Sequence, residues 1–240
     1  MKITQLNGED PHLWPHFWKF FIDSQPYDLS RFHSPHLKRK KIEELFSFYT
    51  KNCHVYEARK NSKLILITFL SEYANFLEVT FLFGLSKNAS NSEMIVALHE
   101  ILKIARGKYK KKYAKSDIRR KHKLGSFKKW IERYDKTAII FNDGKNSILW
   151  CNINIMSAKF KVVGTNKTTK HLMGEEANLG MIRKNPHSLL KELLFEDGVY
   201  LLDEKSVDFL PDRVLIHGFL SDNKENVGKV ALEFIPQHEK

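Results

Sequence analysis

The sequence predicts an α+β fold, with a mixed central sheet flanked by helices and a small C-terminal α+β extension. Segments with alternating apolar residues and segments with helical spacing follow one another through residues 1–155. Capping signals mark helix starts, and an Asn-Asp-Gly turn joins two late strands. A chain of 240 residues can form one domain of about 150 residues and a smaller one. We therefore expect domains over residues 1–160 and 161–240.

Local signals define six elements before residue 85. Asn7-Gly8 ends a first strand, and Pro11 favours a helix start near His12. Ser34-Pro35 is typical of an N-cap followed by the first residue of a helix. The expected strands cover residues 1–6, 54–59, 64–72 and 76–84, and the expected helices begin at residues 12 and 34.

Residues 85–155 predict two further helices and three strands. Ser90 and Glu93 have the spacing of a capping box, so a helix should begin there and run to about Arg106. Ser126 is a second candidate N-cap, and Asn142-Asp143-Gly144-Lys145 is a turn signal between two strands. The remaining expected elements are a strand over 113–120, a helix over 126–134, and strands over 137–141 and 147–155.

The last 80 or so residues are less regular. Ser188 to Phe195 has the leucine spacing of a short helix and follows Pro186. Strands are expected over residues 159–163, 199–202, 213–220 and 229–235. These elements make up the predicted extension.

The order of the elements in residues 1–155 resembles that of the GNAT N-acetyltransferases. Strand, two helices, three strands, helix, strand, helix and strand follow one another, and a long strand over 76–84 leads into a helix near Ser92. The segment FKKWIERYDKTAIIF lies where that family has its last helix and the following strand. The resemblance implies acyl transfer from acyl-CoA, with acetyl-CoA as the expected cofactor and an amine as substrate.

In this family, the fourth strand offers its backbone to the pantetheine arm, and the next loop holds the pyrophosphate at a helix N-terminus. The corresponding stretch here, residues 85–92, contains no glycine, whereas the family motif is glycine-rich. The resemblance implies that cofactor would contact Val79, Phe81, Phe83, Lys87, Asn88, Ala89, Ser90, Asn91 and Ser92.

The resemblance also indicates candidate catalytic residues. A tyrosine in the last helix commonly protonates the leaving thiolate, but alignment of FKKWIERYD places Trp130 there and Tyr134 one turn later. Tyr134 or a water molecule would then be the acid. Glu72 or Glu78 would be the general base that deprotonates the amine, although a solvated position on a strand is the more common place for each of these glutamates.

Positive charge is concentrated in one segment. Of the twenty-one residues from Lys103 to Lys123, eleven are Lys or Arg and one is acidic, whereas the whole chain has a formal net charge of +12. This segment is either a solvated helix end or a site for nucleic acid, for the phosphates of the cofactor or for an acidic protein. The candidate anion-binding residues are Arg106, Lys108, Lys110, Lys111, Lys112, Lys115, Arg119, Arg120, Lys121 and Lys123. The alternative to acyl transfer is therefore a non-catalytic nucleic-acid-binding or assembly protein, for which a bacteriophage source is compatible with the composition.

Several classes of site are not supported by the sequence. His12 and His16 have helical spacing, but Pro15 lies between them and no His-Glu-x-x-His motif follows, so we expect no metal. No apolar run approaches the roughly 20 residues of a membrane span. The polar start and only two cysteines, Cys53 and Cys151, favour a cytoplasmic protein or a particle assembled in the cytoplasm.

Overall fold

The structure is a computed structural model that describes residues 1–8, 10–24, 34–85, 88–117, 124–143, 147–152, 158–185, 188–222 and 226–236. The chain divides into two compact units. The first comprises residues 1–73 and 77–102, and the second comprises residues 74–76 and 103–240.

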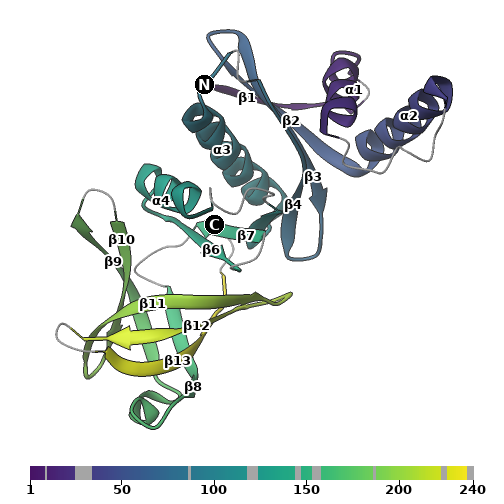
Figure 1. Cartoon of the computed structure of the whole chain (residues 1–240). Helices are drawn as coiled ribbons and strands as arrows, with labels where there is room; N and C mark the ends of the chain where they lie inside the picture. The colour runs from purple at the N-terminus through teal and green to yellow at the C-terminus, as the bar shows by residue number, and fades with distance from the viewer. Residues whose placement is uncertain are drawn as a thin grey trace. The chain divides into compact units, whose positions relative to one another are not determined.

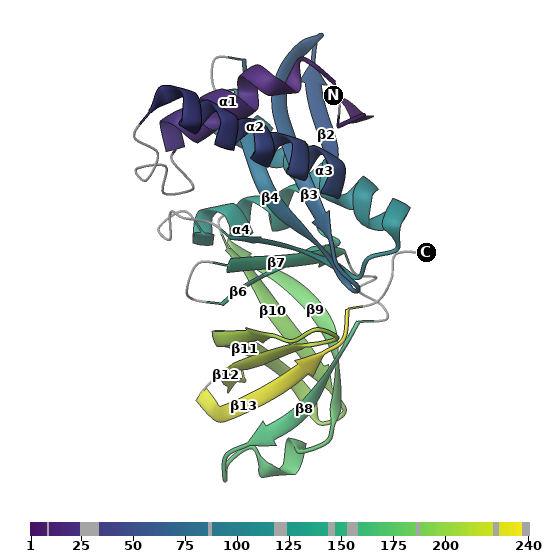
Figure 2. The same cartoon turned by 90° about the vertical axis from the view of Figure 1, so that its right-hand side faces the viewer.

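An antiparallel sheet with the strand order β1-β2-β3-β4 forms the first unit. Its elements are β1 (Lys2–Leu6), α1 (Leu13–Ser24), α2 (Pro35–Asn52), β2 (Cys53–Lys60), β3 (Lys63–Glu72), β4 (Phe76–Gly84) and the first part of α3 (Asn91–Tyr109). Helices α1 and α2 lie on one side of the sheet and α3 lies on the other (Figures 1 and 2). Ser34 caps α2 as predicted, because its Oγ accepts a hydrogen bond from the amide of Leu37 at 3.1 Å.

Aromatic side chains fill the space between the sheet and α1 and α2. Phe17 and Phe21 of α1 are fully buried, and the ring centroid of Phe17 lies 5.5 Å from that of Phe81 on β4. Ile42 of α2 completes the same cluster. The aromatic face of α1 is therefore a core-facing surface.

The second unit begins with a small antiparallel sheet in the order β5-β7-β6. These strands are β5 (Tyr113–Asp117), β6 (Ala138–Asn142) and β7 (Ser147–Asn152), and α4 (Leu124–Tyr134) precedes β6. The pairing of β6 with β7 confirms the hairpin predicted from the Asn-Asp-Gly turn signal.

A closed six-stranded barrel completes the second unit. Each strand pairs with the next one in the chain, and the last strand pairs with the first. The strands are β8 (Lys159–Thr165), β9 (Glu176–Asn185), β10 (Ser188–Phe195), β11 (Gly198–Phe209), β12 (Val214–Ser221) and β13 (Asn226–Phe234), with one short 3-10 turn at Lys170–Leu172.

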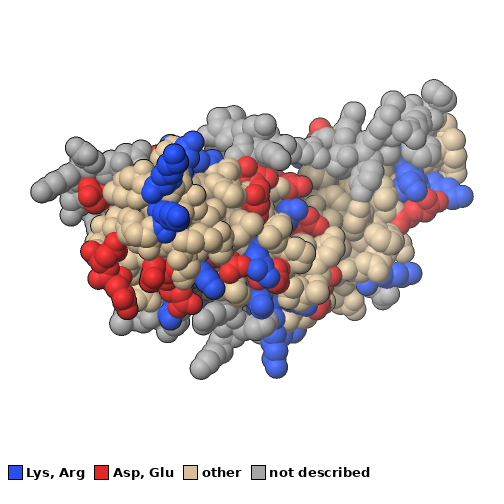
Figure 3. Space-filling view, turned by 90° about the horizontal axis from the view of Figure 1, so that it is seen from below, with Lys and Arg blue, Asp and Glu red and all other residues tan. Residues whose placement is uncertain are grey.

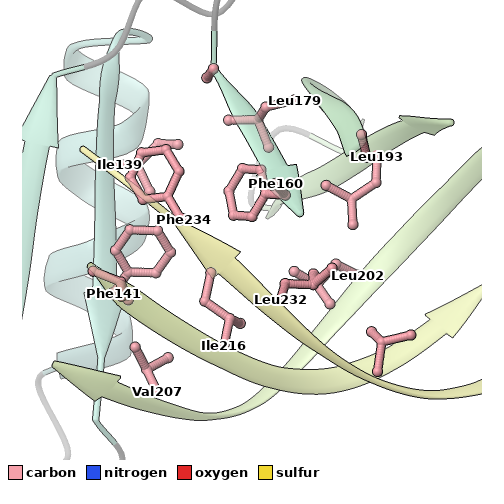
Figure 4. Close-up of a cluster of buried hydrophobic side chains, with 14 of the residues drawn as sticks. Ile139, Phe141, Phe160, Leu179, Leu193, Leu202, Val207, Ile216, Leu232 and Phe234 are labelled. Atoms are coloured by element: carbon pink, nitrogen blue, oxygen red, sulfur yellow. The ribbon is translucent and has the colours of Figure 1, made fainter. Parts of the chain in front are cut away.

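Side chains fill the barrel. Phe160, Ile216, Leu232 and Phe234 point inward and are fully buried, and the rings of Phe160 and Phe234 stack with centroids 4.9 Å apart (Figure 4). Residues of the small sheet, among them Phe141, belong to the same cluster. A barrel of six strands is narrower than the eight-stranded barrels whose interiors side chains only just fill. The described side chains of the interior therefore form a packed core.

The structure confirms the predicted α+β class but corrects the interpretation of the extension. Ser188–Phe195 is the strand β10, so the predicted helix there is wrong. Strand β9 was not predicted, and β11 is much longer than the expected 199–202. The domain boundary at residue 160 stays a prediction. No helix in the part of the chain that the structure describes is long and apolar enough to cross a lipid bilayer.

Candidate functional site

Strand β4 carries one extra residue where it pairs with β3. Phe69 is opposite Phe81 and Leu70 is opposite Val79, which leaves Thr80 without a partner in the ladder. The Thr80 hydroxyl lies 2.5 Å from the hydroxyl of Ser71. A bulge of this kind interrupts the ladder and turns backbone groups away from the neighbouring strand, and bulges often lie next to active sites.

The N-terminus of α3 follows β4 and is closed by the predicted capping box. The Ser90 amide donates to Glu93 Oε2 at 2.8 Å, and the Glu93 amide donates to Ser90 Oγ at 3.3 Å. In the described structure, no protein acceptor is recorded for the amides of Asn91 and Ser92, the first two residues of α3. These two N–H groups, together with the helix dipole, favour an anion at this end of α3.

The Glu93 carboxylate is already at this position. Hydrogen bonds from the ammonium group of Lys60, and then from the amide and hydroxyl of Ser90, lower the pKa of Glu93 to about 2. The carboxylate is therefore ionised at neutral pH. Lys60 also forms an ion pair with it, which offsets part of the negative charge that an incoming phosphate would meet.

The loop between β4 and α3 is also held by its own contacts. Asn88 donates from its amide to the Leu85 carbonyl at 2.8 Å and from Nδ2 to the Leu64 carbonyl at 2.6 Å. A Cβ on Gly84 would lie 2.5 Å from Sδ of Met94, so the Met94 side chain covers the end of β4. Asn88 therefore holds the loop to β3, and its amide and its Nδ2 are used in hydrogen bonds within the protein. Lys87, a predicted cofactor contact, lies outside the described residues.

Two other predicted cofactor contacts point into the core. Phe81 and Phe83 are each 7% exposed and pack in the cluster with α1. Val79 is only half-buried. The side chains of Phe81 and Phe83 are thus unavailable to a ligand, and only the backbone of β4 could contact one.

The two candidate bases lie on opposite faces of the sheet. Ser71 is paired with Glu78 and Glu72 with Leu77 at the end of the β3–β4 hairpin, so Glu72 and Glu78 point in opposite directions. Glu72 Oε2 lies 2.8 Å from His54 Nε2. A hydrogen bond with Glu78 raises the pKa of Tyr73. One acceptor site can therefore contain at most one of these carboxylates, and the role of each stays a prediction.

Tyr134, the candidate acid, belongs to the second unit. Its ring stacks on Trp130 with centroids 5.8 Å apart and an interplanar angle of 6°, and the residue is 48% exposed. Its hydroxyl end is thus on an accessible surface of α4, while Trp130 occupies the preceding turn.

The basic segment is divided among several elements. Arg106 is only 1% exposed and donates to Asn152 Oδ1 within the second unit, so it is enclosed and does not belong to a surface anion site. Lys111 Nζ donates to the Ala74 carbonyl at 3.3 Å, and the Lys112 amide donates to the Asn75 carbonyl at 3.0 Å. Lys108 and Lys110 are exposed.

The remaining members of the basic segment are half-buried or lie outside the described residues. Lys115 is half-buried on β5, and Arg119, Arg120, Lys121 and Lys123 lie outside the described residues. On the face shown in Figure 3, Lys and Arg side chains are interspersed with Asp and Glu and form no continuous basic patch. Nucleic-acid contact by this segment stays a prediction. Among the described residues, no group of three His, Cys, Asp or Glu side chains is placed to hold a metal ion.

The observed element order through β7 is the one implied by the predicted resemblance to GNAT acetyltransferases. No family model matches the sequence, and no curated protein matches it. Solved structures of acetyltransferases are similar to it in fold. An acetyltransferase from Streptococcus agalactiae is 13% identical, with a TM-score of 0.41, over 64% of this chain and 98% of that one.

Two further solved structures differ in how much of the chain they cover. The PaiA N-acetyltransferase from Thermoplasma acidophilum, in complex with coenzyme A, is 18% identical, with a TM-score of 0.37, over 63% of this chain and 98% of that one. A putative acetyltransferase from Pyrococcus horikoshii is 9% identical, with a TM-score of 0.38, over 98% of this chain and 89% of that one.

Proposed function

We propose that this chain binds an acyl-coenzyme A thioester along β4 and at the N-terminus of α3 and transfers the acyl group to an amine. The observation that carries the proposal is the succession of a bulged strand at Thr80 and a helix whose first two amides have no acceptor among the described residues. The bulge leaves the backbone of Thr80 outside the ladder for the thioester arm, whereas the next carbonyl, that of Phe81, already accepts a hydrogen bond from the Thr68 hydroxyl at 3.0 Å. The amides of Asn91 and Ser92 suit the pyrophosphate.

Two charged residues near these amides have opposite effects on the binding of an anion. Lys60 supplies a positive charge next to the helix N-terminus, whereas the ionised Glu93 repels a phosphate from the same place. We therefore expect binding that is weak in the wild-type chain and stronger when the charge of Glu93 is removed.

Chemistry on the bound thioester needs a base for the amine and an acid for the leaving thiolate. In the proposal, Glu72 or Glu78 takes the proton of the amine, and Tyr134 or a water molecule donates one to the thiolate. Cys53 is a poor candidate for a covalent intermediate, because burial raises the pKa of its thiol and so disfavours the thiolate.

Acetyl-CoA should raise the melting temperature of the chain. A ligand that binds only the folded state stabilises it by about 2.7 kcal/mol at 100 times its dissociation constant. Glu93→Gln keeps the capping hydrogen bonds but removes the charge, and should tighten binding by roughly two- to fivefold. The measurement is a thermal-shift titration with acetyl-CoA up to millimolar concentration.

Two further variants control this experiment. Asn91→Pro removes one of the two open amides at a position where helices tolerate proline, so it should weaken binding without unfolding α3. Glu43→Gln removes an exposed carboxylate on α2 that pairs with Arg39, and should leave binding unchanged. The absence of any shift in both the wild type and Glu93→Gln would exclude the acyl-CoA proposal and leave the fold as a non-catalytic scaffold.

A further inference from the structure

The outer face of the barrel carries a groove that the proposed acyl transfer does not use. It has a volume of about 510 Å³ and lies over β8, β11, β12 and β13. Its lining includes Gly164, Thr165, Lys205, His217, Phe219 and Lys229. All of these residues belong to the second unit, so the groove is complete within that unit.

Strand register places the lining side chains on the outside. Phe219 is paired with Lys229 across β12 and β13, and paired residues point to the same face of a sheet. The neighbouring residues Ile216 and Leu220 are fully buried in the barrel, whereas Phe219 is only half-buried. An aromatic ring is therefore presented on the outer surface of the barrel, where other apolar side chains such as Val163, Leu194 and Val199 are also exposed.

Two ammonium groups lie beside this ring. Lys205 Nζ and Lys229 Nζ are each 5.7 Å from the centroid of the Phe219 ring. None of the described residues that line the groove is acidic. Lys205 is paired with Asp203 at 2.5 Å, but Lys229 has no carboxylate within ion-pair distance in the described part of the chain. The groove therefore combines an aromatic surface with a positive charge that is not neutralised.

The backbone around Lys229 is held in place. The Asn166 amide donates to the Lys229 carbonyl at 3.2 Å, and the Thr169 hydroxyl lies 2.8 Å from the same carbonyl. Asn166 Oδ1 accepts a hydrogen bond from the Thr169 amide at 3.1 Å. Gly228 has a φ of +145°, and a Cβ there would lie 2.8 Å from Asn166 Oδ1. Because the rim is fixed in the absence of a ligand, less ordering is needed when one binds.

We propose that this groove binds a nucleotide unit, with its base stacked on Phe219 and its phosphate held by Lys229 and Lys205. A planar base and an anionic phosphate are the two complements of an aromatic surface flanked by ammonium groups. The formal net charge of +12 would attract a polyanionic strand to the surface. The nucleotide is either free or part of a single strand, and the test separates these sources.

Fluorescence anisotropy with labelled dT12 at 50 mM salt tests the proposal. Phe219→Leu keeps the apolar volume but removes the stacking surface, and should weaken binding on the order of tenfold. Lys229→Gln should weaken binding by a similar factor and reduce the slope of log K against log salt by about 0.7. Unlabelled AMP and TMP serve as competitors. If they displace dT12 at equal nucleotide concentration, the ligand is a free nucleotide, and if only longer strands do so, it is a strand.

Two controls locate the binding. Lys170→Gln removes an exposed lysine elsewhere on the barrel and should change the affinity less than twofold. The double variant Lys108→Gln/Lys110→Gln removes exposed charges from the basic segment. The groove is excluded if neither dT12 nor a mononucleotide binds, if Phe219→Leu binds as tightly as the wild type, or if only the Lys108/Lys110 variant loses affinity. Equal melting temperatures of the Lys229→Gln variant and the wild type would show that its loss is not due to unfolding.

Discussion

Replacing Glu204 with glutamine should lower the free energy of unfolding by about 3–5 kcal/mol, because it removes the charge that pairs with the buried Lys191 and with Lys128, and the nearby carboxylate of Glu132 then offsets their charge only in part. Glu204 on β11 forms an ion pair with Lys191 of β10, and both of its oxygens lie 3.2 Å from Nζ of Lys128 on α4. Lys191 is 7% exposed, and its Nζ lies 4.3 Å from the centroid of the Phe141 ring. Equilibrium unfolding in urea measures the change.

A matched variant on the same barrel separates burial from ion pairing. Glu176→Gln breaks the pair with Lys159, and the two side chains are 52% and 60% exposed. Because water screens this pair, the loss of stability should be much smaller than for Glu204→Gln. Lys191→Met in the Glu204→Gln background removes the unpaired cation and should recover part of the stability. Equal losses of unfolding free energy for Glu204→Gln and Glu176→Gln would contradict the prediction that the buried ion pair contributes more than the exposed one.

The same cluster predicts a dependence of stability on pH. Burial alone would raise the pKa of Glu204, but the charges of Lys191 and Lys128 outweigh it and lower the pKa to about 2 from an ordinary value of 4.5. A carboxyl whose folded-state pKa is lowered stabilises the fold above its ordinary pKa. We therefore expect this contribution to be complete above pH 4.5 and to be lost as the pH falls towards 2. The Glu204→Gln variant should show a smaller loss over that range.

Phe17→Ala should also cost about 3–5 kcal/mol, and should lower the melting temperature by about 6–20 °C. Phe17 is fully buried, and its removal would leave a cavity between the sheet and both covering helices. Its ring lies within 6.4 Å, centroid to centroid, of the rings of Phe21, Phe46, Tyr49, Phe69, Phe81 and Phe83.

Phe48→Ala is the matched control, because Phe48 lies on α2 but is 57% exposed. We expect it to change the free energy of unfolding by less than about 0.5 kcal/mol. Thermal and denaturant unfolding of both variants measures the difference. A loss below about 1 kcal/mol for Phe17→Ala would show that this cluster does not carry the stability of the first unit.

Helix starts were predictable because their signals are local. The Ser90–Glu93 capping box and the Ser34 cap each form within three residues, so the sequence contains both partners of each bond. The consequence of the first box for function was not predictable. Only the structure shows that Lys60, from the distant strand β2, pairs with the Glu93 carboxylate at the place where a phosphate would bind.

Strand β10 was misassigned because its side chains also suit a helix. Leu189, Leu190, Leu193 and Leu194 have near-helical spacing, and leucine, lysine and glutamate favour helices. In the structure, pairing with β9 and β11 turns Lys191, Leu193 and Phe195 inward. The sequence does not show the alternation of apolar and polar residues that is typical of a strand, because one residue of this inward-facing series is a lysine. Its partner, Glu204, is a long-range contact that no local pattern indicates.

The candidate site was partly predictable. The order of β4 and α3 placed the loop correctly, but alternation alone could not show which face of β4 is buried, and Phe81 and Phe83 proved to be core residues. The bulge at Thr80 depends on how β3 and β4 pair, which a single strand does not encode. The outer groove depends on the register of four strands, so its lysines could not be singled out by composition.

The pairing of β13 with β8 has a consequence for folding during synthesis on the ribosome. Residues 226–234 form the strand that closes the barrel by pairing with β8. A nascent chain that ends before these residues therefore has two unpaired strand edges, and its Phe160 and Val162 side chains are uncovered. Ribosome stalling or a premature stop codon in this stretch would thus release an aggregation-prone chain with an open barrel rather than a slightly shortened native protein.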